Sequence, residues 1–171
     1  LSIFHQLGYN TLIFDYRGYG NSSGIPTENG TYQDALASWN YLIENKAIPA
    51  LHIVVFGESL GGAIAAWLAA RKKPGALVLA STFISIPDIA ADLYPLLPVR
   101  LMARFQYSTI EYLQSIKCPV LIAHSPDDEI VPYKHAQALF AKAPGPKQFI
   151  VLQGKHNDSF FTAQETWVDP L

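Results

Sequence analysis

The sequence predicts an α/β fold in which a mostly parallel sheet has helices on both faces. Two observations support this prediction. Short apolar runs alternate with longer segments whose apolar residues recur at helical spacing, an order typical of βαβ units. The short runs are continuously apolar, as expected for parallel strands that helices cover on both sides. Because the chain has no internal repeat, low-complexity tract or long linker, we expect residues 1–171 to form one domain.

Five strands are expected, and turn or loop residues separate them from the segments that follow. The first strand ends at Asp15, and a turn-rich loop continues to about Gly30. The five strands cover residues 11–14, 53–56, 76–79, 120–123 and 149–152.

Helices are expected between these strands. One begins at about Tyr32, where apolar residues recur every three or four positions. Another covers residues 64–71 and ends at a basic segment containing Pro and Gly, and a further helix begins near Pro132, a residue favoured in a first turn. Residues 82–115 interrupt this alternation of strands and helices, because they contain three prolines and only short helical patches. We expect them to form a short lid-like excursion that covers a site or packs beside it.

Composition excludes several classes of function. Half of the 171 residues are hydrophobic and 15% are charged, which predicts a globular chain with a large core. The net charge of −2 gives no basic surface for nucleic acid or an anionic membrane, and no apolar stretch approaches the roughly 20 residues that span a bilayer. The single cysteine, Cys118, excludes an intrachain disulfide and a Cys-based zinc site, and we expect it to be buried. We expect neither a metal nor a cofactor, and nothing in the sequence indicates an oligomeric state.

A candidate nucleophile lies in the segment Gly57-Glu58-Ser59-Leu60-Gly61, which follows a predicted strand and precedes a predicted helix. This is the context of a nucleophile elbow, a sharp strand-to-helix turn that exposes a serine. We expect Gly57 and Gly61 to be required as small residues because such a turn leaves little space. The backbone N–H of Leu60 is expected to face an oxyanion. The alternative interpretation is a tight structural turn.

A serine nucleophile needs a histidine that accepts its proton and a carboxylate that orients the histidine. Of the histidines after Ser59, His124 closes a predicted strand, and His135 lies within a predicted helix, where we expect it to face solvent. His156 lies in a loop after the last strand and is the predicted base, with an ordinary loop histidine as the alternative. Residues 127–129 offer three carboxylates for the acid, and spacing alone does not distinguish them.

Four ordered motifs resemble those of lipase- and esterase-like α/β-hydrolases. Residues 15–20 are similar to the family's loop after its fourth strand, and residues 57–62 are similar to its nucleophile elbow. Residues 124–132 resemble its His-Gly-x-x-Asp-x-x-Val-Pro segment, a match that implies Asp128 as the catalytic acid. Residues 154–158 resemble its terminal Gly-His-Asn-Asp segment. The branch most resembled has a minimal lid and includes bacterial serine hydrolases and eukaryotic depalmitoylase-like enzymes.

The resemblance implies a serine hydrolase that cleaves carboxylic ester or thioester bonds of a small-molecule substrate. Ser59, His156 and Asp128 would form its triad and pass through an acyl-enzyme intermediate. The alternatives are a serine peptidase of the same fold and a non-catalytic scaffold or binding module. A dinucleotide-binding fold is disfavoured, because turn residues rather than a helix follow the glycines after Asp15.

The chain also departs from the family pattern. Ser125 replaces a glycine in the third motif, and Lys155 replaces a small residue in the fourth. The family's first three strands and its second oxyanion N–H have no counterpart, and the chain begins without Met or a signal peptide. We therefore expect an upstream segment, carrying any targeting signal or anchor, with the cytoplasm as the default location. The isolated chain is expected to be unstable and nearly inactive.

The resembled fold places its third strand between the strands that end here near Asp15 and Phe56. Without that strand, we expect these two either to pair directly or to leave the first one loosely attached. No motif indicates the substrate-binding residues. Apolar side chains near the predicted site are candidates for a wall that favours short-to-medium acyl groups, although core packing explains them almost as well. They are Phe83, Ile84, Tyr94, Leu96, Leu97, Phe160 and Phe161.

Overall fold

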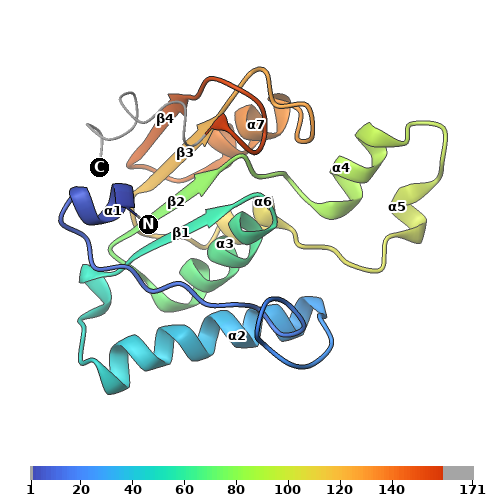
Figure 1. Ribbon diagram of the computed structural model, residues 1–171. Coiled ribbons are helices and arrows are strands. Elements are labelled where there is room, and N and C mark those ends of the chain that lie inside the picture. The colour runs from blue at the N-terminus through green and yellow to red at the C-terminus, as the bar shows by residue number, and fades with distance from the viewer. Residues whose placement is uncertain (1, 160–171) are drawn as a thin grey trace.

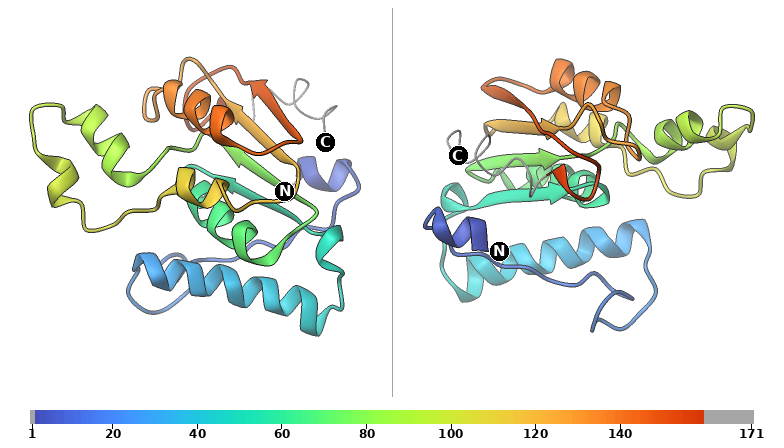
Figure 2. Two further views of the ribbon diagram at one scale, coloured as in Figure 1. Left: turned by 180° about the vertical axis from the view of Figure 1, so that it is seen from behind. Right: turned by 45° about the horizontal axis from the view of Figure 1, so that its top comes forward.

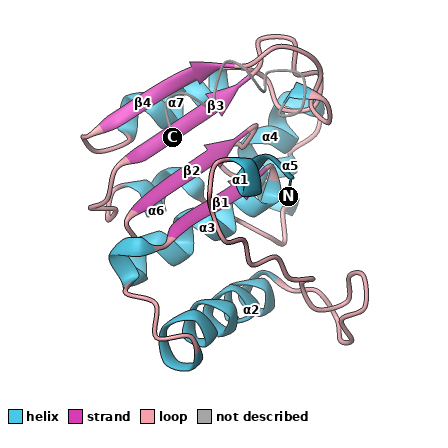
Figure 3. Ribbon diagram, turned by 60° about the vertical axis from the view of Figure 1, so that its left-hand side comes forward, coloured by secondary structure: helices cyan, strands magenta, loops and turns pink. Residues whose placement is uncertain are grey.

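The computed structural model describes residues 2–159. Its centre is a sheet of four parallel strands in the order β1-β2-β3-β4, so strands that follow one another in the chain are neighbours in the sheet (Figure 3). These strands agree with the predicted second to fifth strands to within two residues at each end. Their bounds are Val54–Glu58 for β1, Ala76–Ala80 for β2, Val120–His124 for β3 and Lys147–Val151 for β4.

Of the helices that connect the strands, α3 (Leu60–Lys72), α6 (Thr109–Leu113) and α7 (Lys134–Lys142) lie along one face of the sheet (Figure 1). Crossovers between parallel strands are right-handed, so a sequential strand order brings successive connections to the same side. The helices are α1 Ser2–Gln6, α2 Glu28–Asn40, α3 Leu60–Lys72, α4 Ile86–Leu93, α5 Val99–Met102, α6 Thr109–Leu113 and α7 Lys134–Lys142. None of these helices is long and apolar enough to cross a membrane within residues 2–159.

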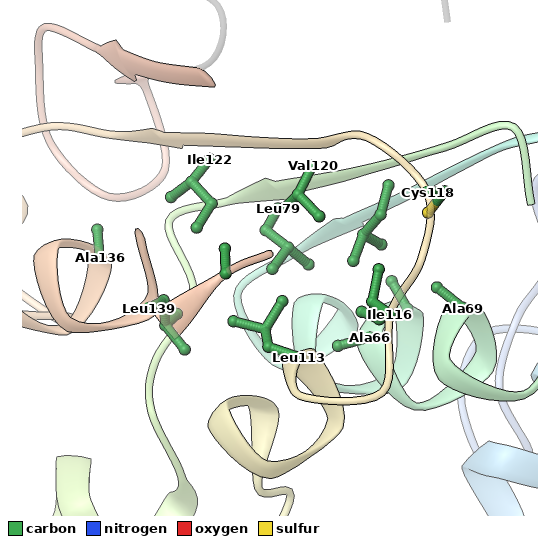
Figure 4. Close-up of a cluster of buried hydrophobic side chains, with 13 residues drawn as sticks. Ala66, Ala69, Leu79, Leu113, Ile116, Cys118, Val120, Ile122, Ala136 and Leu139 are labelled. Atoms are coloured by element: carbon green, nitrogen blue, oxygen red, sulfur yellow. The ribbon is translucent and has the colours of Figure 1, made fainter. Parts of the chain in front are cut away.

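Alternate residues of the central strands divide the core between the two faces of the sheet. Leu79 of β2 and Ile122 of β3 pack on the face that α3, α6 and α7 cover (Figure 4). Leu113 and Cys118 belong to the same cluster, so the predicted burial of Cys118 is confirmed. Val78, which points the other way, packs in a separate cluster with residues of the α1 region. Helices therefore flank both faces, which confirms the predicted fold class.

α2 lies beside α3, beyond the edge of the sheet that β1 forms (Figure 3). Tyr32 and Trp39 of α2 pack with Ile64 of α3, and the ring of Tyr32 stacks on Trp67 with the ring centres 4.6 Å apart. The helix begins one turn before the predicted start, because the hydroxyl of Thr27 accepts a hydrogen bond from a backbone N–H of the first turn. α2 therefore buries part of the surface of α3 through Ile64 and Trp67.

Residues 11–14 do not form the predicted first strand. Within the part of the chain that the structure describes, β1 pairs with β2 alone, and residues 11–14 have no strand partner. Leu12 and Ile13 are 44% and 72% exposed. The prediction fails because an apolar, β-branched segment becomes a strand only where a neighbour supplies ladder hydrogen bonds and a surface to pack on. Of the two expected outcomes, direct pairing is wrong and the unpaired arrangement is observed.

Residues 82–115 contain two parts with different surroundings. α4 and α5 project away from the sheet (Figure 2), and Leu96 between them and Leu101 of α5 are 96% and 90% exposed. α6 instead packs in the core through Leu113, which is fully buried. The projecting part of this region therefore ends before α6.

Candidate active site

Ser59 lies at a sharp turn between β1 and α3. Its backbone has φ 52° and ψ −120°, a combination that residues with a side chain rarely adopt. The N–H of Ser59 donates to the carbonyl of Ala80 at 3.0 Å, so the turn begins where β1 stops pairing with β2. Leu60 is the first residue of α3, and N–H groups in a first helical turn have no acceptor within the helix. The turn thus places a hydroxyl and a backbone donor at the carboxyl edge of the sheet.

The two glycines that flank this turn differ in the space around them. A Cβ atom on Gly57 would collide with the backbone of Gly61 and lie 2.7 Å from the side chain of Ala65. A Cβ atom on Gly61 would have only the hydroxyl of Tyr16 within 4 Å among the described residues, at an ordinary contact distance of 3.9 Å. The expectation that the turn needs a small residue is therefore confirmed at Gly57, whereas a Cβ atom at Gly61 would meet no close neighbour among the described residues.

Ser59, His156 and Asp128 meet at the carboxyl ends of three strands. His156 Nε2 lies 3.1 Å from Ser59 Oγ, and His156 Nδ1 lies 2.8 Å from Asp128 Oδ2. Because a carboxylate oxygen only accepts, Nδ1 carries the hydrogen and Nε2 faces the serine hydroxyl with a lone pair. Such a chain of hydrogen bonds is able to move a proton from a hydroxyl to an imidazole.

The Asp128 carboxylate is buried, accepts three hydrogen bonds and lies close to a fourth donor. Oδ1 accepts from the backbone N–H groups of Ile130 and Val131, at 3.0 and 2.8 Å. Oδ2 accepts from His156 and also lies 3.3 Å from Nε2 of His124. Burial alone would raise the pKa of Asp128, but the hydrogen bonds outweigh burial and hold this pKa well below its usual value. Asp128 therefore faces His156 as an anion.

The surroundings of His156 are anionic. Its pKa is raised, first by the hydrogen bond to Asp128, which acts against burial, and further by the charges of Glu58 and Glu129. Glu129 also accepts a hydrogen bond from the backbone N–H of His156 at 3.1 Å. Burial raises the pKa of Glu58. These groups stabilise the imidazolium that forms when His156 takes up a proton.

The three adjacent carboxylates occupy different positions. Asp128 faces the ring of His156, and Glu129 binds the backbone of the same residue. Asp127 is exposed, and its backbone N–H donates to the hydroxyl of Ser125 at 3.1 Å. Of the three residues that spacing left open, the structure brings the side chain of Asp128 to His156, as the resemblance implied.

The two histidines set aside in the sequence are both buried. His124 contacts Asp128, a relationship that the sequence did not indicate except by placing a polar residue at the end of a buried strand. His135 is 1% exposed, so the expectation that it faces solvent is wrong. Its Nε2 lies 2.8 Å from Asp92, and its Nδ1 accepts from the N–H of Ile84 at 3.2 Å. The α4 segment covers this face of α7, and periodicity within α7 does not reveal that contact.

An apolar pocket of about 330 Å³ lies beside the turn at Ser59, because Leu60 forms part of its wall. The remaining wall comes from the loop after residue 15, the start of α2 and both ends of the α4–α5 projection. Burial is the main cause that raises the pKa of Tyr16 to about 12, so this wall residue is uncharged at neutral pH. Its wall includes the side chains of Tyr16, Tyr19, Leu60, Ile86, Phe105 and Tyr107.

None of the expected wall residues that the structure describes, including half-buried Ile84, lines this pocket. Phe83 is buried in the core, whereas Tyr94, Leu96 and Leu97 are exposed on the projection. Residues 160–161 lie outside the described residues. The sequence missed the wall because loop conformation, and not adjacency in the chain, decides which side chains face the pocket. Residues 2–159 contain no cluster of three or more His, Cys, Asp or Glu side chains that could hold a metal ion.

Comparison with known proteins shows the family to which the chain belongs. A family model described as alpha/beta hydrolase fold matches residues 2–106. Uncharacterized protein Rv2307c of Mycobacterium tuberculosis is 42% identical over 155 residues, covering 90% of this chain and 55% of that protein. Alpha/beta hydrolase domain-containing protein WAV2 of Arabidopsis thaliana is 34% identical over 184 residues, covering 96% of this chain and 60% of that protein. The chain thus spans about half to three fifths of the length of these curated relatives.

Solved structures show the same architecture. The alpha-beta hydrolase from Vibrio vulnificus superposes with a TM-score of 0.75 at 25% identity, covering 91% of this chain and 60% of that one. Esterase Pf2001 from Pyrococcus furiosus superposes with a TM-score of 0.78 at 21% identity, covering 98% of this chain and 69% of that one, and this likeness concerns the fold alone. The parallel sheet and the strand–turn–helix at Ser59 are consistent with this architecture. Because the family model matches residues 2–106, the chain belongs to the alpha/beta hydrolase family.

Proposed function

We propose that this chain carries the catalytic core of a serine hydrolase that cleaves carboxylic ester or thioester bonds. The observation that carries the proposal is the hydrogen-bonded chain from Ser59 Oγ through His156 to Asp128. The apolar pocket beside Leu60 supports a substrate with an apolar acyl group.

Ser59 is the nucleophile in this proposal. As its Oγ attacks the acyl carbon, its proton passes to Nε2 of His156, and the carbonyl electron pair moves to the oxygen. Asp128 keeps Nδ1–H oriented and stabilises the imidazolium, while the N–H of Leu60 donates to the oxyanion from the start of α3. When the intermediate collapses, the C–O or C–S bond breaks. His156 then gives the proton to the leaving alcohol or thiol.

Water completes the cycle by the same route. His156 Nε2 takes a proton from water as the water oxygen attacks the acyl-Ser59 carbon, and the second tetrahedral intermediate forms. Its collapse breaks the bond between Ser59 Oγ and the acyl carbon. The proton on His156 returns to Ser59 Oγ, so the products are a carboxylic acid and the free enzyme.

Labelling of the full-length protein with a fluorophosphonate tests the nucleophile, because this probe phosphonylates an activated serine. We expect a single adduct on Ser59, located by mass spectrometry, and no adduct in Ser59→Ala. The exposed Ser23 supplies the control, since Ser23→Ala should react as the unmodified protein does. No adduct in the unmodified protein would favour a non-catalytic scaffold or binding module.

A substrate panel tests the bond that is cleaved. We expect aryl and alkyl esters or thioesters with apolar acyl groups to be hydrolysed faster than short peptides, because the pocket beside Leu60 is lined by apolar side chains. A preference for peptides in a protein that reacts with the fluorophosphonate would identify a serine peptidase instead.

A further inference from the structure

His124, the last residue of β3, is fully buried beside the candidate acid. Its Nε2 lies 2.8 Å from the carbonyl oxygen of Val131 and 3.3 Å from Oδ2 of Asp128. Both neighbours are acceptors, so Nε2 carries the hydrogen, which bonds to Val131 O and also lies close to Oδ2 of Asp128. Nδ1 of His124 has no hydrogen-bond partner among residues 2–159. The ring therefore acts as a single donor directed at the turn that holds Asp128.

The oxygen of Asp128 that His124 approaches is the one that His156 uses. Oδ2 accepts from Nδ1 of His156 at 2.8 Å and lies 3.3 Å from Nε2 of His124, whereas Oδ1 accepts from two backbone N–H groups. Rotation of the carboxylate about its Cβ–Cγ bond would break hydrogen bonds at both oxygens. The three hydrogen bonds and the nearby N–H of His124 together fix which oxygen faces His156.

We infer that His124 is a positioning residue, which orients the Asp128 carboxylate and disperses the negative charge that acts on His156. The inference rests on the proposed function, in which His156 is the base. A donor to Oδ2 reduces the electrostatic stabilisation that Asp128 gives to the imidazolium. His156 therefore keeps its neutral, proton-accepting form to a lower pH than it would beside an Asp128 without this donor.

A purely structural role for His124 would depend on Val131 alone. The bond from Nε2 to the carbonyl of Val131 closes the turn after β3 whatever the charge of Asp128. Loss of that bond would lower the stability of the fold but would leave the pKa of His156 unchanged. The titration of His156 therefore separates the two roles, whereas a loss of rate alone does not.

The test is an NMR titration of the His156 ring in the full-length protein. In His124→Leu the donor is lost, and we expect the midpoint for His156 to move upward by about half a pH unit or more. His124→Gln can place an amide N–H near the position of Nε2 and should restore the original midpoint. The ionisable groups that act on His156 are Asp128, Glu58 and Glu129, and all variants retain them.

His135→Leu is the matched control, since it also removes a buried histidine that binds a carboxylate, at Asp92, outside the candidate site. It should lower stability without moving the His156 midpoint. If His124→Leu does not fold, His124→Asn replaces it, because its shorter amide does not reach Asp128. An unchanged midpoint in the variant without the donor, or an equal shift in His124→Gln, would overturn the inference.

The same variants separate this inference from the proposed function. At pH values below the His156 midpoint, His124→Leu should react with the fluorophosphonate about threefold or more slowly than the unmodified protein. This difference in rate should shrink at alkaline pH. A structural defect would be similar at all pH values. A protein that does not react with the probe at all contradicts the proposed function, while the NMR titration still decides the role of His124.

Discussion

Thr82 Oγ1 donates a 2.7 Å hydrogen bond to the backbone carbonyl oxygen of Ser59. Thr82 follows β2, the neighbour of β1, so this bond connects the turn at Ser59 to the adjacent strand. The N–H of Gly62 donates to the same oxygen at 3.0 Å. The unfavourable backbone conformation of Ser59 is therefore held both by its own helix and by the next strand of the sheet.

Thr82→Val removes this donor and keeps the shape of the side chain. We expect the free energy of unfolding to fall by about 1 kcal/mol, because the carbonyl of Ser59 keeps one of its two donors. The fluorophosphonate reaction at Ser59 should also be slower, whereas Thr82→Ser keeps the hydroxyl and should react as the unmodified protein does. Urea unfolding and reaction rates measure the two effects. Equal rates in both variants would show that the bond does not hold the turn.

The glycines around Ser59 form a matched pair for a test of packing. Gly57→Ala should lower the free energy of unfolding by about 1–3 kcal/mol, because the new methyl group would overlap the first turn of α3. Gly61→Ala should change it by less than about 1 kcal/mol, since Gly61 has free space and lies in a helix, where alanine is favoured. Thermal or urea unfolding measures both. A larger loss for Gly61→Ala than for Gly57→Ala would contradict the geometry.

The adjacent residues Asp127 and Asp128 test the acid. Asp128→Asn replaces the carboxylate with an amide that favours the wrong tautomer of His156, and we expect the hydrolysis rate to fall by about 10³–10⁴-fold. Asp127→Asn alters an exposed side chain and should change the rate by no more than about twofold. Rates with a chromogenic ester give the comparison. A large loss for Asp127→Asn with little effect of Asp128→Asn would reassign the acid.

The pKa of His156 predicts the pH dependence of the reaction. His156 accepts a proton only in its neutral form, and its pKa lies above the ordinary histidine value of 6.5. The value of kcat/KM should therefore fall as the pH decreases through the raised pKa. Glu58→Gln removes one of the charges that raise this pKa, so the fall should move to lower pH. An unchanged midpoint in Glu58→Gln would contradict the electrostatic argument.

The same shift predicts a pH-dependent contribution to stability. Because the pKa of His156 is higher in the folded state than in the unfolded one, its contribution is fully present below about pH 6.5. This contribution is lost as the pH rises through the raised pKa. Urea unfolding of His156→Gln beside the unmodified protein, at acidic and alkaline pH, measures the difference. The opposite pH dependence would contradict the direction of the shift.

The features that the sequence predicted correctly depend on neighbours in the chain. The strands β1 to β4 are apolar runs between turn residues, and the turn at Ser59 depends on Gly57 and on the start of α3. The proximity of His156 to Ser59, 97 positions away, was expected only because parallel strands bring their following loops to one edge of the sheet. The catalytic role of these residues remains a prediction.

The features that the sequence missed depend on segments far apart in the chain. The polarity and helical position of His135 suggest exposure, but Asp92, 43 positions away, covers it. Residues 11–14 have the composition of a strand, yet composition does not specify whether a pairing neighbour is present. The contact of His124 with Asp128 was missed for a different reason. The two residues are only four positions apart, and the conformation of the turn between them, which the sequence does not specify, brings their side chains together.

The last prediction concerns Asp92, which connects α4 to α7 through two hydrogen bonds. Its carboxylate accepts from exposed Lys134 at 2.6 Å and from buried His135 at 2.8 Å. Asp92→Ala leaves the buried N–H of His135 without an acceptor, so we expect the free energy of unfolding to fall by about 1–3 kcal/mol. Lys134→Ala removes only the exposed partner and should cost less than about 1 kcal/mol. Hydrogen exchange in α4 should also be faster in Asp92→Ala than in Lys134→Ala. Equal losses in the two variants would mean that the exposed ion pair, and not the buried histidine, fixes α4 against α7.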